Sequence, residues 1–158
     1  MNNALADRMA GILVKVAAAG LLIVTLIIGW QVFGRYILQS SPSWTEQAAL
    51  LLMIWYVFLA AAAGVWERFH IRIEILEQSW TAKNRRRLRI GIHMLVALMG
   101  LALLVYGAVL AWDVRVHVIP SLGISRAWAY VVIPLAGLLI AVFSLARIGV
   151  RLAEREAE

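Results

Sequence analysis

The sequence contains no cysteine and only three prolines in 158 residues. Without thiols, the chain has no disulfide, no thiolate nucleophile, no cysteine-bound zinc and no iron–sulfur cluster. Charge is also scarce, because 15% of the residues are charged and 63% are hydrophobic, against about a quarter and about a half in soluble domains. The mean hydropathy is +0.85. This composition predicts a protein whose surface faces lipid.

Four long stretches of the chain lack Asp, Glu, Lys and Arg altogether. They are residues 16–34, 47–66, 90–112 and 127–146, of 19, 20, 23 and 20 residues. A helix of about 20 residues crosses about 30 Å of hydrocarbon, and none of these stretches has the polar stripe of a soluble bundle. We therefore predict an all-α fold, an integral membrane four-helix bundle formed by one domain over residues 1–158. Its predicted spans are about 12–34, 46–66, 88–112 and 127–147.

The basic residues are distributed unevenly between the segments that flank these stretches. Twelve of the 15 lysines and arginines fall in segments 1–15, 67–89 and 147–158, and three fall in 35–46 and 113–126. Because cationic loops stay in the cytoplasm, we predict that both termini are cytoplasmic (N-in/C-in). The tryptophans predicted to lie at the membrane surface are Trp30, Trp44, Trp66, Trp112 and Trp128. Trp80 falls in the cytoplasmic loop.

Capping residues and proline predict where the second and fourth helices begin. Ser43-Trp44-Thr45-Glu46 has the form of a capping box, in which Ser43 and Glu46 satisfy each other's amides. The fourth helix is predicted to start at Ser125. Pro134 should bend that helix, because its ring removes one backbone hydrogen bond.

The middle cytoplasmic loop is predicted to have two parts. Residues 69–75 alternate apolar and polar side chains, which by itself predicts a strand. A lone strand has no partner there, so we predict an extended or short helical segment lying on the membrane surface. Thr81 is then a candidate N-cap for a helix from Ala82 to about Trp112. Its cations Lys83, Arg85, Arg86, Arg87 and Arg89 are expected to bind membrane lipids, and no aromatic platform beside them points to nucleic acid.

The uncharged stretches contain none of the carboxylates or cations that ion-coupled carriers place near the bilayer midplane. A complete carrier, including a small four-helix drug exporter, is therefore not expected. A haem-binding membrane anchor of a respiratory enzyme needs paired histidines within the bilayer, and of His70, His93 and His117 only His93 lies there. A zinc site, a membrane enzyme with a polar pocket, catalytic residues and cofactors are likewise not expected. The haem-binding anchor stays as the alternative to a subunit that works by packing against a partner.

Small residues provide candidate surfaces for such packing. Residues 60–64, Ala-Ala-Ala-Ala-Gly, form a smooth patch on the second helix, and Gly100 and Gly107 are placed similarly on the third. The same residues also suit packing of the four helices against one another. Trp55 lies near the middle of the second span, and we interpret it as a packing or interface residue and not as part of a ligand site.

An ordered set of short motifs resembles a known family. The set comprises Phe33-Gly34-Arg35-Tyr36, Trp44-Thr45-Glu46, Ile54-Trp55, Phe58-Leu59-Ala60-Ala61 and His70-Ile71-Arg72-Ile73-Glu74, followed by Ile124, Trp128, Tyr130 and Pro134. Their order and spacing over about residues 10–150 resemble the small membrane subunit, DctQ-like, of tripartite ATP-independent periplasmic (TRAP) transporters. Two positions depart from the family pattern, which often has Glu where Gln47 stands and Gly where Ala60 stands.

The resemblance implies a three-part secondary transporter in a bacterial inner membrane. A periplasmic substrate-binding protein would capture an organic acid, and a large membrane subunit would carry the substrate and sodium sites. The small subunit would serve as a scaffold that holds the large one in place. On this interpretation, the candidate residues of the interface with the large subunit are Arg35, Trp44, Glu46, Trp55, Ala61 and Gly64, with simple anchoring at the membrane surface as the alternative role.

Overall fold

The computed structural model describes residues 3–40, 42–67 and 82–156. Within these ranges, four helices are long and apolar enough to cross a membrane, which confirms the predicted all-α fold of a membrane four-helix bundle. They are α1 (Asn3–Tyr36), α2 (Trp44–Glu67), α4 (Ala82–Asp113) and α6 (Val132–Glu156). A short helix, α5 (Ala127–Tyr130), precedes α6.

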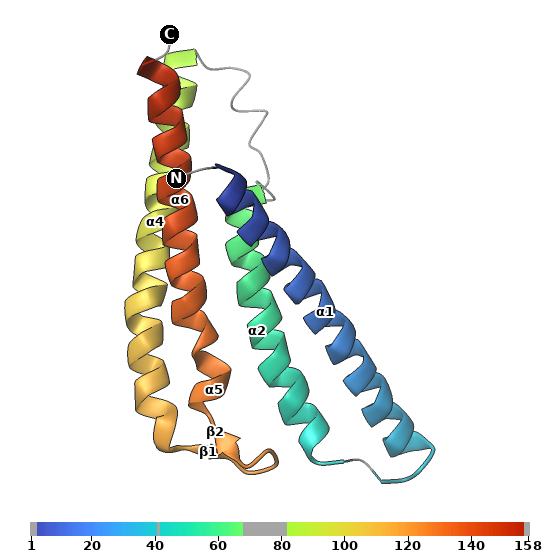
Figure 1. The fold of residues 1–158 in the computed structure, drawn as a ribbon. Helices are drawn as coiled ribbons and strands as arrows, with labels where there is room; N and C mark the ends of the chain where they lie inside the picture. The colour runs from blue at the N-terminus through green and yellow to red at the C-terminus, as the bar shows by residue number, and fades with distance from the viewer. Residues whose placement is uncertain (1–2, 41, 68–81, 157–158) are drawn as a thin grey trace.

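The four helices pack as two antiparallel pairs (Figure 1). α1 packs along α2 and α4 packs along α6, while α2 against α6 forms the main contact between the pairs. The pairs lie close together at the end where α6 finishes and separate toward the end that carries the α1–α2 connection. The two termini lie at the same end of the bundle. The assignment of that end to the cytoplasm stays a prediction from the charge distribution.

The α4–α6 pair approaches so closely that glycine is required in both helices. A Cβ added at Gly137 would lie 2.6 Å from the Leu104 amide nitrogen and 2.7 Å from the Gly100 carbonyl oxygen. A Cβ at Gly100 would lie 2.8 Å from the Ala141 nitrogen. Gly100 and Gly107, predicted as candidates for a smooth surface, thus face α6 of the same chain. Small residues allow this backbone contact between membrane helices.

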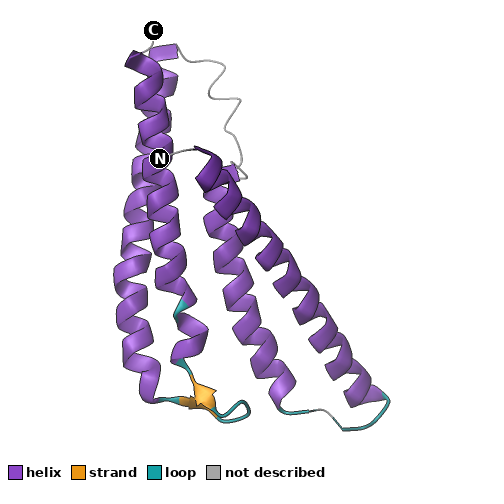
Figure 2. Cartoon of the chain, viewed as in Figure 1, coloured by secondary structure: helices purple, strands orange, loops and turns teal. Residues whose placement is uncertain are grey.

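The fourth predicted span is interrupted between α5 and α6 (Figure 2). Pro134 lies four residues after Tyr130 and has no N–H to donate to the Tyr130 carbonyl, so the chain leaves helical hydrogen bonding there. A neighbouring helix satisfies part of the interrupted backbone, because the Trp55 indole Nε1 of α2 donates to the Trp128 carbonyl over 2.9 Å. The bend predicted at Pro134 is therefore a break one turn earlier in the chain.

A small β-hairpin separates α4 from α5. After the 3₁₀ turn η1 (Val114–Val116), strand β1 (Val118–Ile119) pairs antiparallel with β2 (Ile124–Ser125). Gly123 closes the turn at φ +65°, a conformation that suits glycine. The prediction that a helix starts at Ser125 was wrong by two residues, because Ser125 completes the hairpin and its Oγ accepts the Ala127 amide over 3.2 Å.

The α1–α2 connection is tightly turned after Tyr36. The Ile37 amide donates to the Phe33 carbonyl over 2.8 Å, and the Ser40 amide donates to the Gly34 carbonyl over 3.0 Å. A Cβ on Gly34 would lie 2.9 Å from the Ser40 carbonyl oxygen. α2 then starts at Trp44, and the hydrogen bond found at its start runs from Thr45 Oγ1 to the Pro42 carbonyl, 2.8 Å away.

Some of the predicted features lie outside the described residues. These are the surface segment 69–75, the Thr81 N-cap, Trp80 and His70. The helix predicted from Ala82 to about Trp112 is present as α4, which ends at Asp113.

Candidate functional site

The six candidate interface residues do not form one surface. Arg35, Trp44 and Glu46 lie together at the end of the bundle that carries the α1–α2 connection, and all three side chains are exposed. Arg35 sits in the last turn of α1 and Glu46 in the first turn of α2, where their charges complement the helix dipoles. Trp44 is 42% exposed. This end of the α1–α2 pair therefore presents a cation, an anion and an aromatic ring to its surroundings.

The other three candidate residues are used differently. Trp55 is half-buried, and its indole N–H donates to the Trp128 carbonyl of the same chain. Gly64 is buried, as are Ala62 and Ala63 beside it, so most of the predicted smooth patch packs within the bundle. Ala61 is exposed and lines a groove.

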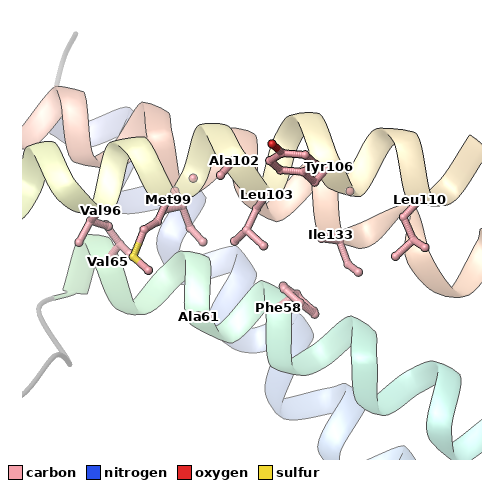
Figure 3. Close-up of a pocket in the computed structure, with 13 residues that line it drawn as sticks. Phe58, Ala61, Val65, Val96, Met99, Ala102, Leu103, Tyr106, Leu110 and Ile133 are labelled. Carbon is pink, nitrogen blue, oxygen red and sulfur yellow. The ribbon is translucent and has the colours of Figure 1, made fainter.

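That groove runs between α2 and α4 and has a volume of about 650 Å³. Its walls include Phe58, Ala61 and Val65 of α2 and Val96, Leu103 and Leu110 of α4, while α6 contributes Ile133 and Ile140 (Figure 3). Tyr106 is the one residue of its described lining with a polar side-chain group. A surface so rich in hydrocarbon does not solvate a carboxylate or a metal ion. The groove is suited to binding hydrocarbon groups.

A second cluster joins three helices at the end where the two pairs converge. The Trp66 indole Nε1 donates to Asp7 Oδ1 over 2.6 Å, which links α2 to α1. The Arg147 guanidinium of α6 stacks 4.1 Å from the centre of the Trp66 ring and donates to the Trp66 carbonyl. Phe143 packs beside the same ring, with 5.7 Å between ring centres. We call Asp7, Trp66, Phe143 and Arg147 the three-helix clasp.

Sequence reasoning placed Trp66 at the membrane surface and missed the clasp. Trp66 is only 4% exposed, whereas Trp30, Trp112 and Trp128 are more than half exposed near helix ends. The carboxylate of Asp7, near the start of α1, is a hydrogen-bond acceptor, and it was the signal of this cluster that the sequence offered. The partner 59 residues away was not deducible from spacing.

The two histidines that the structure describes, His93 and His117, lie on different elements. His93 is half-buried in α4, and His117 is exposed beside β1, where its carbonyl accepts the Arg126 amide over 2.7 Å. In the part of the chain that the structure describes, no group of three or more His, Asp or Glu side chains is placed to hold a metal ion.

Comparison with known proteins gives two matches. The family model described as tripartite ATP-independent periplasmic transporters, DctQ component, matches residues 24–154. A relative from Vibrio cholerae serotype O1, the sialic acid TRAP transporter small permease protein SiaQ, is 26% identical over 122 residues. That match covers 77% of this chain and 70% of the relative. The family-model match includes the whole of α2, α4, the hairpin and α5.

Proposed function

The chain belongs to the DctQ component family of tripartite ATP-independent periplasmic transporters, and we propose that it acts as the scaffold of a sodium-coupled transporter for organic acids. It is a small permease subunit and a multi-pass inner-membrane protein. Family membership implies association with a large membrane subunit and a periplasmic binding protein. The sodium and substrate sites are assigned, in this proposal, to the large subunit.

The observation that carries the scaffold proposal is the apolar lining of the groove between α2 and α4. Transport of an anion needs polar or charged groups within the membrane, and sodium, like other hard cations, takes oxygen ligands. The lining of this groove offers the hydroxyl of Tyr106, a side chain that is 75% exposed. Four apolar helices packed against the large subunit would instead widen the complex in the bilayer. A wider complex resists displacement in the membrane while the transport domain of the large subunit moves.

We expect the chain reconstituted alone to transport nothing. Liposomes that contain only this subunit, with an imposed sodium gradient and a panel of radiolabelled carboxylates that includes sialic acid, should show the uptake of empty liposomes. Addition of the large subunit and the binding protein should restore sodium-dependent uptake of one member of the panel. Uptake by the chain alone would contradict the scaffold role, while restored uptake without a sodium gradient would contradict the coupling.

We propose that contact with the large subunit involves the exposed end of the α1–α2 pair. The Trp44→Ala, Glu46→Gln double variant should lower recovery of the large subunit by about fivefold or more, since exposed aromatic anchors contribute strongly to interfaces. The measurement is a pull-down from membranes at matched expression. Trp112→Ala is the matched control, because Trp112 is 65% exposed at the same end of the bundle but on α4. Loss of the partner in the control alone would place the interface on α4.

A further inference from the structure

We propose that the groove between α2 and α4 binds one phospholipid, with an acyl chain along the groove and the phosphate at the end of α4 that carries Arg89 and His93. The shape of the groove, its lining and the charge at one end of it each support this assignment.

The groove is long and narrow. From Val96 to Leu110 it follows α4 for about 21 Å, at 1.5 Å per residue. A volume of about 650 Å³ over that length gives a mean cross-section of about 30 Å². A section of this size fits one or two hydrocarbon chains.

The lining is continuous hydrocarbon along this length. Val65, Val96 and Met99 lie at the end of the groove near the C-terminus of α2, and Leu110 and Ile133 lie toward the other end (Figure 3). Between Phe58 and Val65, α2 presents the small exposed side chain of Ala61, which leaves room in the groove. An acyl chain gains contact along such a surface without leaving any polar group unsatisfied.

A guanidinium and an imidazole continue the lining row of α4 at one end of the groove. Arg89 and His93 precede Val96 at a spacing of four and three residues, which continues the lining row Val96, Leu103 and Leu110 along one face of α4. Both side chains are half-buried and make interactions within the chain. A guanidinium has five N–H donors, so an engaged arginine still has capacity for a phosphate oxygen.

The clasp adds a cation at the same end. Arg147 stacks on Trp66, the neighbour of groove residue Val65. The acidic residues described near this end are Asp7, which accepts the Trp66 N–H, exposed Glu67, and Glu154 and Glu156 in the last turn of α6. At the opposite end the described cations are Arg115 and Arg126, and Arg115 stacks 3.8 Å from the centre of the Trp112 ring and donates to the Trp112 carbonyl. The head of an anionic lipid is placed beside Arg89, because Arg89, His93 and Arg147 lie next to the lining residues Val96 and Val65.

Photo-crosslinking of the assembled transporter tests this assignment directly. The complex of this subunit with its large subunit is reconstituted in vesicles of phosphatidylethanolamine and phosphatidylglycerol. The vesicles also contain phosphatidylglycerol with a diazirine near either the carboxyl end or the methyl end of one acyl chain. After illumination, peptide mass spectrometry should find the first probe on Val65 and Val96 and the second on Phe58 and Leu103. Equal labelling of the groove and of the exposed far side of α4, at Leu101, would overturn the proposal.

Variants with matched controls provide the second measurement. Ala61→Trp fills the groove and Arg89→Gln removes the head-group cation, so each should lower groove labelling by about fivefold. Leu101→Trp adds the same ring outside the groove and Arg126→Gln removes a cation from the other end of the bundle, and both should label as the unaltered complex does. Labelling that is unchanged in Ala61→Trp, or a cross-link from a photoreactive residue at position 61 to the large subunit, would show that no lipid occupies the groove.

Discussion

Gly137→Ala in α6 should destabilise the protein although it adds a single methyl group to a helix. The new Cβ would lie 2.6 Å from the Leu104 amide nitrogen and 2.7 Å from the Gly100 carbonyl oxygen. These are backbone atoms of α4, so the helices must separate to admit the methyl. Overpacking of this kind costs about 2 kcal/mol, which lowers the Tm of a chain of this size by about 4–8 °C. Gly137→Leu should abolish recovery of folded protein.

The control for this prediction lies in the same helix. A Cβ at Gly149 meets nothing within 4 Å, so Gly149→Ala should leave the Tm unchanged or raise it through better helix propensity. Thermal unfolding of the purified protein in detergent, followed by tryptophan fluorescence, compares the two variants. If Gly137→Ala unfolds at the same temperature as Gly149→Ala, then α4 and α6 do not touch as described.

The Gly137 site also shows what the sequence could and could not predict. The length of the uncharged stretches was sufficient to predict four membrane helices, because crossing the hydrocarbon fixes a minimum length. Gly100 and Gly107 were correctly predicted as sites of close helix contact. The sequence did not identify the helix that they contact, because lipid and protein favour the same apolar side chains. Spacing along one helix carries no information about which helix packs against it.

The candidate interface was predictable only in part. Arg35, Trp44 and Glu46 lie together because a short connection keeps the ends of α1 and α2 close. Gly64 lies in the bundle, and Trp55 is hydrogen-bonded to the Trp128 carbonyl of α5, a partner 73 residues along the chain. The groove depends on how the two helix pairs diverge, and that angle is a property of packing that no local pattern encodes.

Trp66→Ala should have the second large effect, because the clasp depends on this one side chain. Replacement of a buried aromatic residue by alanine costs about 3–5 kcal/mol. It also leaves the Asp7 carboxylate without its indole donor and the Arg147 guanidinium without the ring on which it stacks. Trp30→Ala is the control, since Trp30 is 52% exposed and its ring contact is with Phe33 of the same helix. That control should unfold at nearly the temperature of the unaltered protein.

Two milder variants separate the hydrogen bond from the packing. Trp66→Phe keeps a ring beside Phe143 but removes the N–H, so it should cost about 1.5–3 kcal/mol, the range for a hydrogen bond to a charged group. Asp7→Asn alters the same bond from the side of α1. Because the two residues share one interaction, the effects of the two variants should be less than additive in a double-mutant cycle. Full additivity would mean that Trp66 and Asp7 do not interact.

The regions in which hydrogen exchange rises in Trp66→Ala show whether Trp66 holds three helices together locally or stabilises the whole bundle. α1 contributes Ala6 and Ala10 to the buried core beside Trp66, and most of its remaining length is exposed. Hydrogen exchange in Trp66→Ala should therefore rise in residues 3–10 of α1 and around Phe143 of α6, where local opening becomes easier. Exchange in the β-hairpin at the other end should not change, because no clasp residue reaches it. A uniform rise along all four helices would instead mean that Trp66 stabilises the bundle as a whole and that α1 is held by its packing on α2 alone.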